Sequence, residues 1–313
     1  MSKAPNPVFV ILAFFSVYVI WGSTYLLNKI AVTELPPFML ASIRFMSAGI
    51  LIFILCKILG ISLQISRKQI FNTIIAGFLF LTVGNGVVVW ALKYIDSGFA
   101  ALIISAQPLV IILLMRILDG KKIQLMSIVG VILGITGIYL LVSQKEILGQ
   151  ENSLLGMGMI FLALISWAYG SLFVAKSNLP TNYFVNTAYQ MVSGGALLLL
   201  ASLVVGERWS SPVIWTSATQ LSMVLLILFG SIVAFTSFNY LLKVVSPEKV
   251  ATSTYVNPII AMLLGWYFLN EIVTTQSIVA AFILLTGVYF INTRKRIPTY
   301  SSFSGKLNNK GSK

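Results

Sequence analysis

Two stretches, Ala101-Leu-Ile-Ile-Ser-Ala-Gln-Pro108 and Ala251-Thr-Ser-Thr-Tyr-Val-Asn-Pro258, stand 150 residues apart and share their alanine and their proline. The same offset relates Leu113-Leu114 to Leu263-Leu264 and Ile135-Thr-Gly-Ile-Tyr139 to Leu285-Thr-Gly-Val-Tyr289. Ser127-Ile-Val129 likewise recurs as Ser277-Ile-Val279. Both copies are apolar enough to lie in a membrane. A membrane unit that repeats at this period predicts a protein built from two copies of one structural unit.

Composition indicates that the whole chain is embedded in a membrane. Hydrophobic residues make up 58% of it and charged residues 9%, and the mean hydropathy is +0.95. Soluble domains carry about a quarter charged residues. The first apolar run, residues 8–32, is too long for a cleaved signal peptide. The single cysteine, Cys56, falls inside a predicted span, so no intrachain disulfide is expected.

Ten membrane spans are predicted, since a helix needs about 20 apolar residues to cross the bilayer. With the N-terminus in the cytoplasm, most of the 21 Lys and Arg residues lie on the inner side, as the positive-inside rule requires. The net charge of +13 is therefore assigned to cytoplasmic loops and not to nucleic-acid binding. The predicted spans are 8–31, 36–56, 71–92, 97–116, 124–143, 154–175, 183–206, 219–242, 248–269 and 274–293.

Three segments follow from these spans. Residues 8–143 are predicted to form a first five-helix repeat, residues 154–293 a second one, and residues 294–313 a disordered basic cytoplasmic tail. Five spans per copy is an odd number, so the second copy enters the membrane upside down. The predicted fold class is an all-α polytopic membrane protein with ten transmembrane helices in two inverted five-helix repeats. Such repeats exchange conformations around a midplane site.

Short motifs lie along the spans. They are Trp21-Gly-Ser-Thr24, Arg44-Phe45, Gly84-Asn-Gly-Val-Val-Val-Trp90, Tyr255-Val-Asn-Pro258 and Glu271. Together they resemble the EamA family of the drug/metabolite transporter superfamily. The Gly84–Trp90 motif is similar to the bacterial drug/metabolite exporter subgroup. The resemblance covers residues 8–293 and implies a ten-helix bundle with a central cavity that exports small metabolites. One position departs from the family: Gly120-Lys121 stands where members often have Gly-Glu, whereas the second copy has Asn270-Glu271.

Arg44 is the strongest single candidate for substrate binding. An ionisable residue at this depth of a span faces a cavity or the bundle interior, and the guanidinium fork suits a carboxylate. The structural alternative is that Arg44 bonds helix C-terminal carbonyls and holds spans together. The second copy has Gln190 at the matched position, at an offset of 146. Lys29, near the outer end of span one, is expected to reach the headgroups.

Trp21 and Trp167 share the offset of 146 and lie in the middle of their spans, where Trp is unusual. They are predicted to line a central cavity, and helix packing through the small residues that follow them is the alternative. Ten further residues complete the predicted substrate site with these two. They are Ser23, Thr24, Arg44, Asn85, Trp90, Gln107, Tyr169, Gln190, Tyr240 and Asn257.

Pro108 and Pro258 are predicted to break spans four and nine at matched positions, each directly after an amide residue. A proline frees a backbone carbonyl, which can bind a ligand together with the neighbouring amide. Matched interruptions in two copies are typical of a transporter site. A purely structural kink is the alternative.

The chain has no histidine, and no acidic residue lies near the middle of a predicted span. An intramembrane proton relay is therefore not evident. Either coupling runs through Glu271 or Asp96 at a cavity rim, or the protein is a facilitator, and the sequence favours uncoupled or weakly coupled export. No cofactor and no metal site are predicted. A membrane enzyme is a remote alternative, because clustered nucleophiles and metal ligands are missing, and a channel is another.

The predicted function is a secondary transporter that exports small metabolites, such as amino acids or amphiphilic drugs, by alternating access. An importer, an exchanger or an uncoupled facilitator on the same fold stays open. The expected partners are a small-molecule substrate and the lipid bilayer, without nucleic acid, and a homodimer stays open. The expected location is the bacterial inner membrane, with both termini in the cytoplasm.

Overall fold

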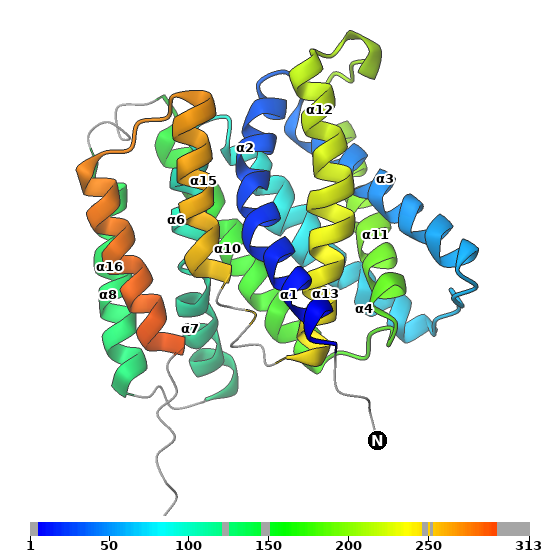
Figure 1. The fold of residues 1–313 in the computed structure, drawn as a ribbon, viewed down its shortest axis with the longest axis horizontal. Coiled ribbons are helices and arrows are strands. Elements are labelled where there is room, and N and C mark those ends of the chain that lie inside the picture. Colours follow the sequence, from blue (N-terminus) through cyan, green and yellow to red (C-terminus); the bar gives the residue numbers. More distant parts are fainter. Residues whose placement is uncertain (1–5, 121–124, 145–150, 246–249, 251–252, 293–313) are drawn as a thin grey trace, which may run out of the picture.

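The structure is a computed structural model that describes residues 6–120, 125–144, 151–245, 250 and 253–292. Within these ranges every regular element is helical and no strand occurs (Figure 1). Eight helices are long and apolar enough to cross a membrane, and two shorter apolar segments, Val256–Leu269 and Thr275–Phe290, follow. The chain is therefore a multi-pass membrane protein. The tail predicted at 294–313 lies outside the described residues.

The first half contains five helices, three of which are made of more than one element. The segments η1 and η2 are π-helical. Helix one is α1 (Pro7–Phe15), η1 (Ser16–Ile20) and α2 (Trp21–Val32); helix two is α3 (Pro37–Ile58); helix three is α4 (Arg67–Gly77), η2 (Phe78–Gly86) and α5 (Val87–Ala91); helix four is α6 (Ser97–Ile104) and α7 (Gln107–Asp119); helix five is α8 (Leu125–Val142).

The second half follows the same plan. A short 3-10 turn, η3 (Pro212–Ile214), precedes helix eight, and the segment η4 within helix eight is π-helical. Helix six is α10 (Ser153–Lys176); helix seven is α11 (Tyr183–Val205); helix eight is α12 (Ser217–Leu225), η4 (Leu226–Val233) and α13 (Ala234–Val244); helix nine is α15 (Ser253–Leu269); helix ten is α16 (Thr275–Asn292).

Helix ends coincide with capping residues in the sequence. Ser66 and Gln69 form a capping box at the start of α4, and the Asn182 side chain accepts the first free N–H groups of α11. Gly120 and Gly206 end α7 and α11 with φ of 63° and 75°, a left-handed conformation that glycine adopts without strain.

The two prolines predicted to break helices behave differently. Helix four is interrupted between α6 and α7, directly before Pro108, as the sequence predicts. Helix nine, in contrast, continues through Pro258, which lies inside α15. The expected break at Pro258 is therefore not present, because a proline in the second turn of α15 removes only one hydrogen bond near the helix start.

The two halves pack through reciprocal helix pairs. Helix two contacts helix seven, helix five contacts helix ten, and helix four contacts helix nine. Helices one and eight, and helices three and six, also pair. Figure 1 shows the α8–α16 pair at one side of the bundle. Three of these pairs join a helix to its own counterpart in the other half. The other two, one with eight and three with six, are equivalent to each other. This is the pattern that two copies around a twofold axis produce.

Matched glycines permit the two closest of these contacts. A Cβ at Gly49 of α3 would lie 2.9 Å from the backbone nitrogen of Val192, and a Cβ at Gly195 of α11 would lie 2.8 Å from that of Met46. Gly137 and Gly287 bring α8 and α16 together in the same way. Small residues let membrane helices approach closely, so these glycines hold the halves together.

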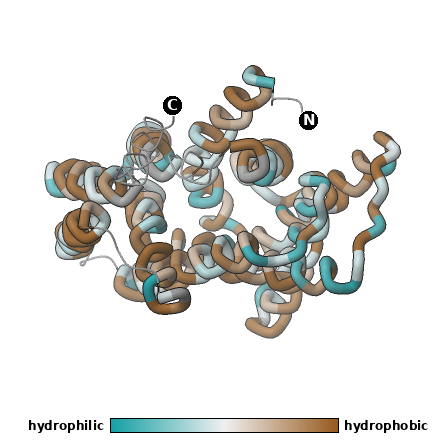
Figure 2. Tube along the Cα trace, turned by 90° about the horizontal axis from the view of Figure 1, so that it is seen from below, coloured by the Kyte–Doolittle hydropathy of each residue, from teal (hydrophilic) through white to brown (hydrophobic). Residues whose placement is uncertain are grey.

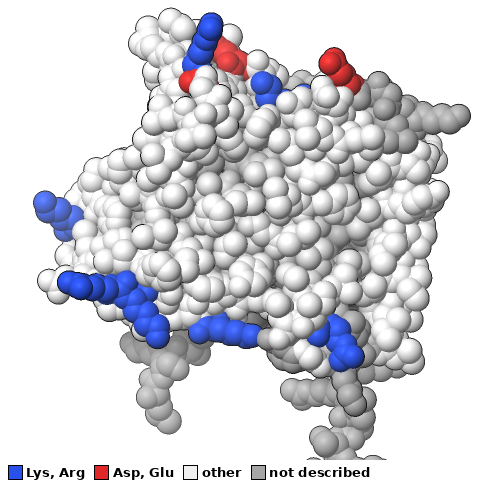
Figure 3. Space-filling model, turned by 180° about the vertical axis from the view of Figure 1, so that it is seen from behind, with Lys and Arg blue, Asp and Glu red and all other residues white. Residues whose placement is uncertain are grey.

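Surface charge gathers at the two ends of the bundle. On the face that Figure 3 shows, the acidic side chains lie at one end and most basic ones at the other, with an uncharged belt between. Large hydrophobic side chains are exposed on the outside of this belt, and hydrophobic residues predominate along most of its helices (Figure 2). We name the two ends by these charges. The acidic end holds Glu34, Glu207 and Glu271, and the basic end holds Lys57, Arg67, Lys68 and Lys176.

Candidate functional site

Trp21 and Trp167 meet in the centre of the fold, with their rings edge to face and their centroids 6.0 Å apart. Each tryptophan packs on a glycine in the third helix of the other half. Trp21 Nε1 donates to the Gly230 carbonyl at 3.2 Å, and a Cβ at Gly84 would lie 3.0 Å from the Trp167 ring. Both glycines belong to π-helical segments, η4 and η2, which occur frequently at functional sites.

Arg44 is buried beside this pair, with 3% of its surface exposed. Its Nε donates to Ser231 Oγ at 2.8 Å, and its Nη1 donates to Asn28 Oδ1 at 3.4 Å. The Phe45 ring lies 4.8 Å from the guanidinium carbon. A Cβ at Gly230 would come within 3.1 Å of Nη2. Across the described residues, no carboxylate forms an ion pair with Arg44. Its partners are neutral side chains and not the helix carbonyls of the alternative reading.

Three of the predicted polar residues bond backbone carbonyls around the Trp21 turn. Ser23 Oγ donates to the Ile20 carbonyl, and Thr24 Oγ1 donates to the Trp21 carbonyl, both at 2.7 Å. Asn257, with its amide oriented to satisfy both atoms, donates to the carbonyls of Tyr18 and Val17 at 2.8 and 3.0 Å. These carbonyls belong to η1, so the amide of helix nine stabilises the π-helical segment of helix one.

Gln190 matches Arg44 in sequence but lies at a different depth. It is buried on α11, within the Ala188–Val192 turn that packs on Gly49. Gln190 is therefore level with Gly49, five residues further along α3 than Arg44, which is about 8 Å at the α-helical rise. Because α3 and α11 run antiparallel, Gln190 lies on the side of the basic end.

The predicted aromatic residues outside the Trp pair lie apart from Arg44. Trp90 packs edge to face on Phe38 with centroids 5.2 Å apart, where α5 meets the start of α3. Tyr240 packs on Tyr183, with centroids 5.7 Å apart, towards the basic end. Tyr169 is 45% exposed on the outside of α10. Two residues along a helix turn a side chain by about 200°, so Tyr169 faces away from its neighbour in the Trp pair.

The remaining amides and prolines contact their own surroundings. Asn85 Nδ2 donates to the Phe80 carbonyl at 3.4 Å within η2. Gln107 is half-buried at the start of α7, next to the buried Pro108, and Pro258 is buried as well. None of the six matched residues, Trp21, Arg44, Pro108, Trp167, Gln190 and Pro258, is exposed. A single cavity lined by all six stays a prediction.

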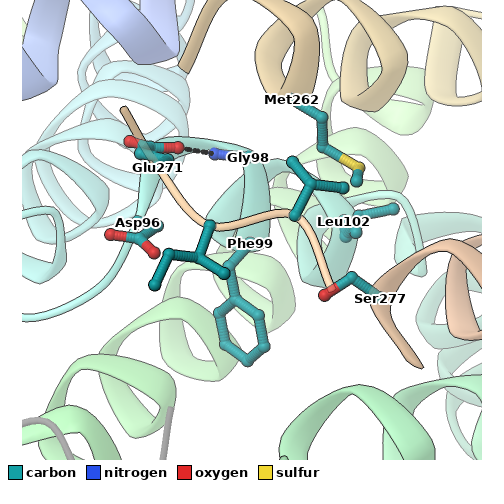
Figure 4. Close-up of a pocket in the computed structure, with 9 residues that line it drawn as sticks. Asp96, Gly98, Phe99, Leu102, Met262, Glu271 and Ser277 are labelled. Atoms are coloured by element: carbon teal, nitrogen blue, oxygen red, sulfur yellow. Dashed lines mark hydrogen bonds between the residues drawn. The ribbon is translucent and has the colours of Figure 1, made fainter. Parts of the chain in front are cut away.

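Glu271 and Asp96, the predicted coupling residues, lie together at the acidic end. Glu271 Oε1 accepts the Ser97 N–H at 2.8 Å, and Oε2 accepts the Ser97 hydroxyl at 2.9 Å. Oε2 also accepts the Gly98 N–H at 3.1 Å (Figure 4). The carboxylate therefore caps α6, where the helix dipole favours negative charge. Both acids border a small pocket with Phe99. Its other lining residues include Leu102, Met262 and Ser277.

Lys29 reaches the same region. Its Nζ donates to the Leu92 carbonyl at 2.7 Å and to the Ile95 carbonyl at 2.8 Å, which follow the last turn of α5. The charges of Asp96 and Glu271 also act on this ammonium. The headgroup contact expected for Lys29 is thus replaced by contacts within the protein, since the free carbonyls at a helix end attract a cation.

Two further glutamates join the halves at the acidic end. Glu207 accepts the N–H groups of Phe38 and Met39 at 3.0 and 2.7 Å, which start α3. Glu34 accepts the N–H and hydroxyl of Thr216, which precedes α12, at 3.1 and 2.8 Å. Hydrogen bonds from Thr219 and Thr216 lower the pKa of Glu34 below its ordinary value of 4.5. Three carboxylates therefore each cap a helix of the other half.

Several of these residues were not singled out from the sequence. Asn28 carried a usable signal, since a side-chain amide inside an apolar span is unusual. Ser231 carried none, because small hydroxyl residues are common in membrane helices. The capping role of the glutamates depends on helices far away in the sequence and could not be read locally.

Comparisons with known proteins agree with this architecture. The sequence matches the EamA-like transporter family over residues 8–143 and 154–293. It is 35% identical to "Uncharacterized inner membrane transporter YedA" of Escherichia coli (strain K12), covering 81% of this chain and 80% of the relative. It is 26% identical to "Probable amino-acid metabolite efflux pump" of the same organism, covering 87% and 91%.

The fold also recurs in a solved structure. A crystal structure superposes on this chain with a TM-score of 0.65 at 18% identity, covering 91% of this chain and 96% of the other. At that identity the likeness shows the fold alone. The family match and the relative at 35% identity together show more, and they confirm the resemblance seen in the motifs: the chain belongs to the EamA-like transporter family.

Proposed function

We propose that the protein is a secondary transporter that moves a small solute with an anionic group across the membrane. The observation that carries this proposal is the Arg44 guanidinium, which is buried at membrane depth and bonded only to a hydroxyl and an amide among the described residues. A buried charge without a counter-charge is costly. A carboxylate on the substrate supplies the missing charge in a geometry that the guanidinium fork accepts.

The surroundings of Arg44 suit a solute that is apolar elsewhere. Trp21 and Trp167 present aromatic surface beside Gly230, and Phe235 and Phe238 extend it, with centroids 6.2 and 5.0 Å from Trp21. Amino acids and amphiphilic drugs combine an anionic or polar group with such an apolar body. One relative carries the name of an efflux pump for amino-acid metabolites, and this supports the same substrate class here.

Alternating access is the proposed mechanism, with the two halves as inverted five-helix copies that rock against each other. The reciprocal helix pairs support it, since they are what two related copies produce. The π-helical segments in helices one, three and eight support it too, because they are points at which a membrane helix bends. The acidic end is closed by the three glutamate caps, so release on that side requires these contacts to separate.

The basic end is proposed to face the cytoplasm, which follows from the positive-inside rule and puts both termini inside. Export is the proposed direction, from the basic end to the acidic end. Coupling is proposed to act through Glu271 and Asp96 at the acidic end and not through a relay inside the membrane.

Reconstituted vesicles test the proposal. Labelled amino acids and amphiphilic anions are screened for efflux and uptake, with and without a proton gradient, using wild-type protein and Arg44→Ala. We expect Arg44→Ala to abolish flux while the protein still inserts and purifies normally, and Arg44→Lys to retain part of it. Arg67→Ala removes an exposed arginine at the basic end and serves as the matched control. Unchanged flux in Arg44→Ala contradicts the anion site, and faster uptake than efflux contradicts the direction.

A further inference from the structure

A network of buried amides and hydroxyls joins α11 and α13 in the basic half of the membrane. Asn186 Nδ2 donates to Asn239 Oδ1 at 3.4 Å, and Asn239 Nδ2 donates to Thr187 Oγ1 at 2.8 Å. Gln190 Nε2 donates to Asn186 Oδ1 at 3.0 Å. All of these side chains are at least nine-tenths buried. The network contains no charged group, so whatever completes it interacts with neutral oxygens and N–H groups.

Two atoms at one edge of this network have no partner. Gln190 Oε1 and Thr236 Oγ1 make no hydrogen bond, and both residues are buried, with 1% and 6% of their surfaces exposed. The two residues lie at the same level of the bundle. Gln190 follows Asn186 by about one turn and Thr236 precedes Asn239 by about one turn, and α11 and α13 run antiparallel, so both lie on the acidic-end side of the Asn186–Asn239 contact. A buried amide oxygen without a donor costs free energy, and more so at membrane depth. This edge is therefore built to accept a hydrogen-bond donor.

Apart from Arg44, which matches Gln190, the positions on α3 that match the network are apolar. They are Leu40 and Ala41, at an offset of 146, and both are buried. The scaffold therefore packs well there without polar groups. The polar version in the second half is not a requirement of the fold, and this favours a role in binding.

The two matched positions have opposite hydrogen-bonding character. Arg44 carries only donors, whereas the free atom of Gln190 is an acceptor. The register of α3 on α11 puts them about 8 Å apart along the membrane normal. Helix eight gives a similar separation along the membrane normal. Thr236 lies five residues after Ser231, the residue that accepts a hydrogen bond from Arg44. Phe235 lies between these two on the same helix and packs on Trp21.

Access to this edge requires α13 to move, and its packing allows such movement. Ala13, Val17, Leu241 and Val250 form a small hydrophobic cluster that is separate from the main core. It joins the basic halves of helices one and eight. The π-helical segments η1 and η4 connect these two helix halves to the rest of the bundle. Helix bends are favoured at such segments, so α13 and α1 can swing together away from α11.

We propose that Gln190 and Thr236 bind a hydrogen-bond donor of the substrate, such as an ammonium group, about 8 Å from the anionic group held by Arg44. This inference rests on the proposed transport function and sharpens it. The substrate class becomes an elongated solute with an anion at one end and an N–H or O–H donor towards the other. Trp21 and Phe235 then contact the apolar part between them.

The test compares two zwitterions of equal charge. Labelled 6-aminohexanoate has an ammonium with N–H donors, and its N,N,N-trimethyl derivative keeps the charge but has no donor. Flux into reconstituted vesicles is measured for wild type, Thr236→Val and Gln190→Leu. We expect each variant to raise the half-saturation constant for 6-aminohexanoate about ten-fold, which corresponds to the loss of one hydrogen bond. The half-saturation constant for the trimethyl compound is expected to stay unchanged. Thr236→Ser and Gln190→Glu keep the acceptors and are expected to restore the affinity.

Matched controls separate binding from folding and from the proposed function. Thr82→Val removes a buried threonine whose hydroxyl already bonds the Gly194 carbonyl at 3.2 Å, and thermal unfolding is recorded for every variant. Equal effects on both zwitterions, or none on either, overturn the donor site. So does a wild-type protein that moves the trimethyl compound as readily as the amine. If Arg44→Gln retains full affinity for 6-aminohexanoate while Thr236→Val loses affinity for this compound alone, the anion site is overturned and the donor site is retained.

Discussion

The acidic end and the basic half of the bundle use polar groups in opposite ways. At the acidic end Glu34, Glu207 and Glu271 each accept N–H groups of a helix from the other half, so their charges are compensated within the protein. In the basic half the network on α11 leaves Gln190 Oε1 and Thr236 Oγ1 without partners. Complete contacts hold the halves closed, whereas incomplete ones retain capacity to bind something else.

The difference also has a mechanical side. Opening the acidic end separates charge-assisted hydrogen bonds, which are stronger than neutral ones. Opening the basic half moves α1 and the end of α13, where Ala13 and Leu241 belong to a small hydrophobic cluster that is separate from the main core. The easier movement is therefore at the basic end. In the proposed transport mechanism, a substrate would enter there, and its binding would contribute to opening the other end.

The largest effect is expected from Glu271→Ala. It leaves the first N–H groups of α6 without an acceptor, and we expect a loss of about 3 kcal/mol from the closed arrangement. The measurement is labelling by a membrane-impermeant maleimide of a cysteine placed at the buried Ala100, with Cys56 replaced by serine. Labelling is expected to rise. Glu151→Ala removes an exposed carboxylate and is the control. Equal labelling in Glu271→Ala and Glu151→Ala would mean that the cap does not close this end.

A smaller effect is expected from Gly230→Ala, at the junction between the two regions. The new methyl group would lie 2.8 Å from the Thr24 methyl and 3.1 Å from Arg44 Nη2. We expect about 1 kcal/mol of overpacking and a reduced affinity for the anionic substrate, because the guanidinium must shift. Gly158→Ala adds the same group where nothing lies within 4 Å. Thermal unfolding and flux of both variants provide the comparison, and unchanged affinity in Gly230→Ala argues against this position of the anion site.

The smallest effect concerns pH at Glu34. Its pKa is lowered in the folded protein by the hydrogen bonds from Thr219 and Thr216. Its contribution to stability is therefore present above the ordinary pKa of 4.5 and is lost as pH falls through the lower folded value. The melting temperatures of wild type and Glu34→Gln are expected to converge as pH falls from above 4.5 through the lowered folded pKa of Glu34. A difference that persists or grows in acid contradicts this role of the carboxylate.

The helical plan was largely predictable from local signals. The apolar runs, the capping residues such as Ser66 and Asn182, and the repeat offsets of 146 and 150 indicate helices in two related sets. The matched tryptophans were also visible, and they meet in the structure. The break at Pro108 followed from the sequence, whereas the continuation of α15 through Pro258 did not, because tertiary packing decides whether a proline bends or interrupts a helix.

The residues around Arg44 were not predictable to the same extent. Its strongest partner, Ser231, is 187 residues away along the chain. Trp90 and Tyr169 carry the same local signals as Trp21, yet one packs on α3 and the other is exposed. A side chain's face on a membrane helix depends on the neighbouring helices, and hydropathy alone does not report it, because lipid and protein interior are equally apolar.

The sequence by itself determined that this chain spans the membrane many times, that its two halves are copies, and that Arg44 and Gln190 occupy matched positions. Hydrophobicity and repetition are properties of the chain, so they need no coordinates. Only the tertiary structure decided that one position is a donor held by neutral partners and the other an acceptor left without one. Hydrogen bonds join atoms that are close in space, and the packing of helices distant in sequence sets which atoms those are.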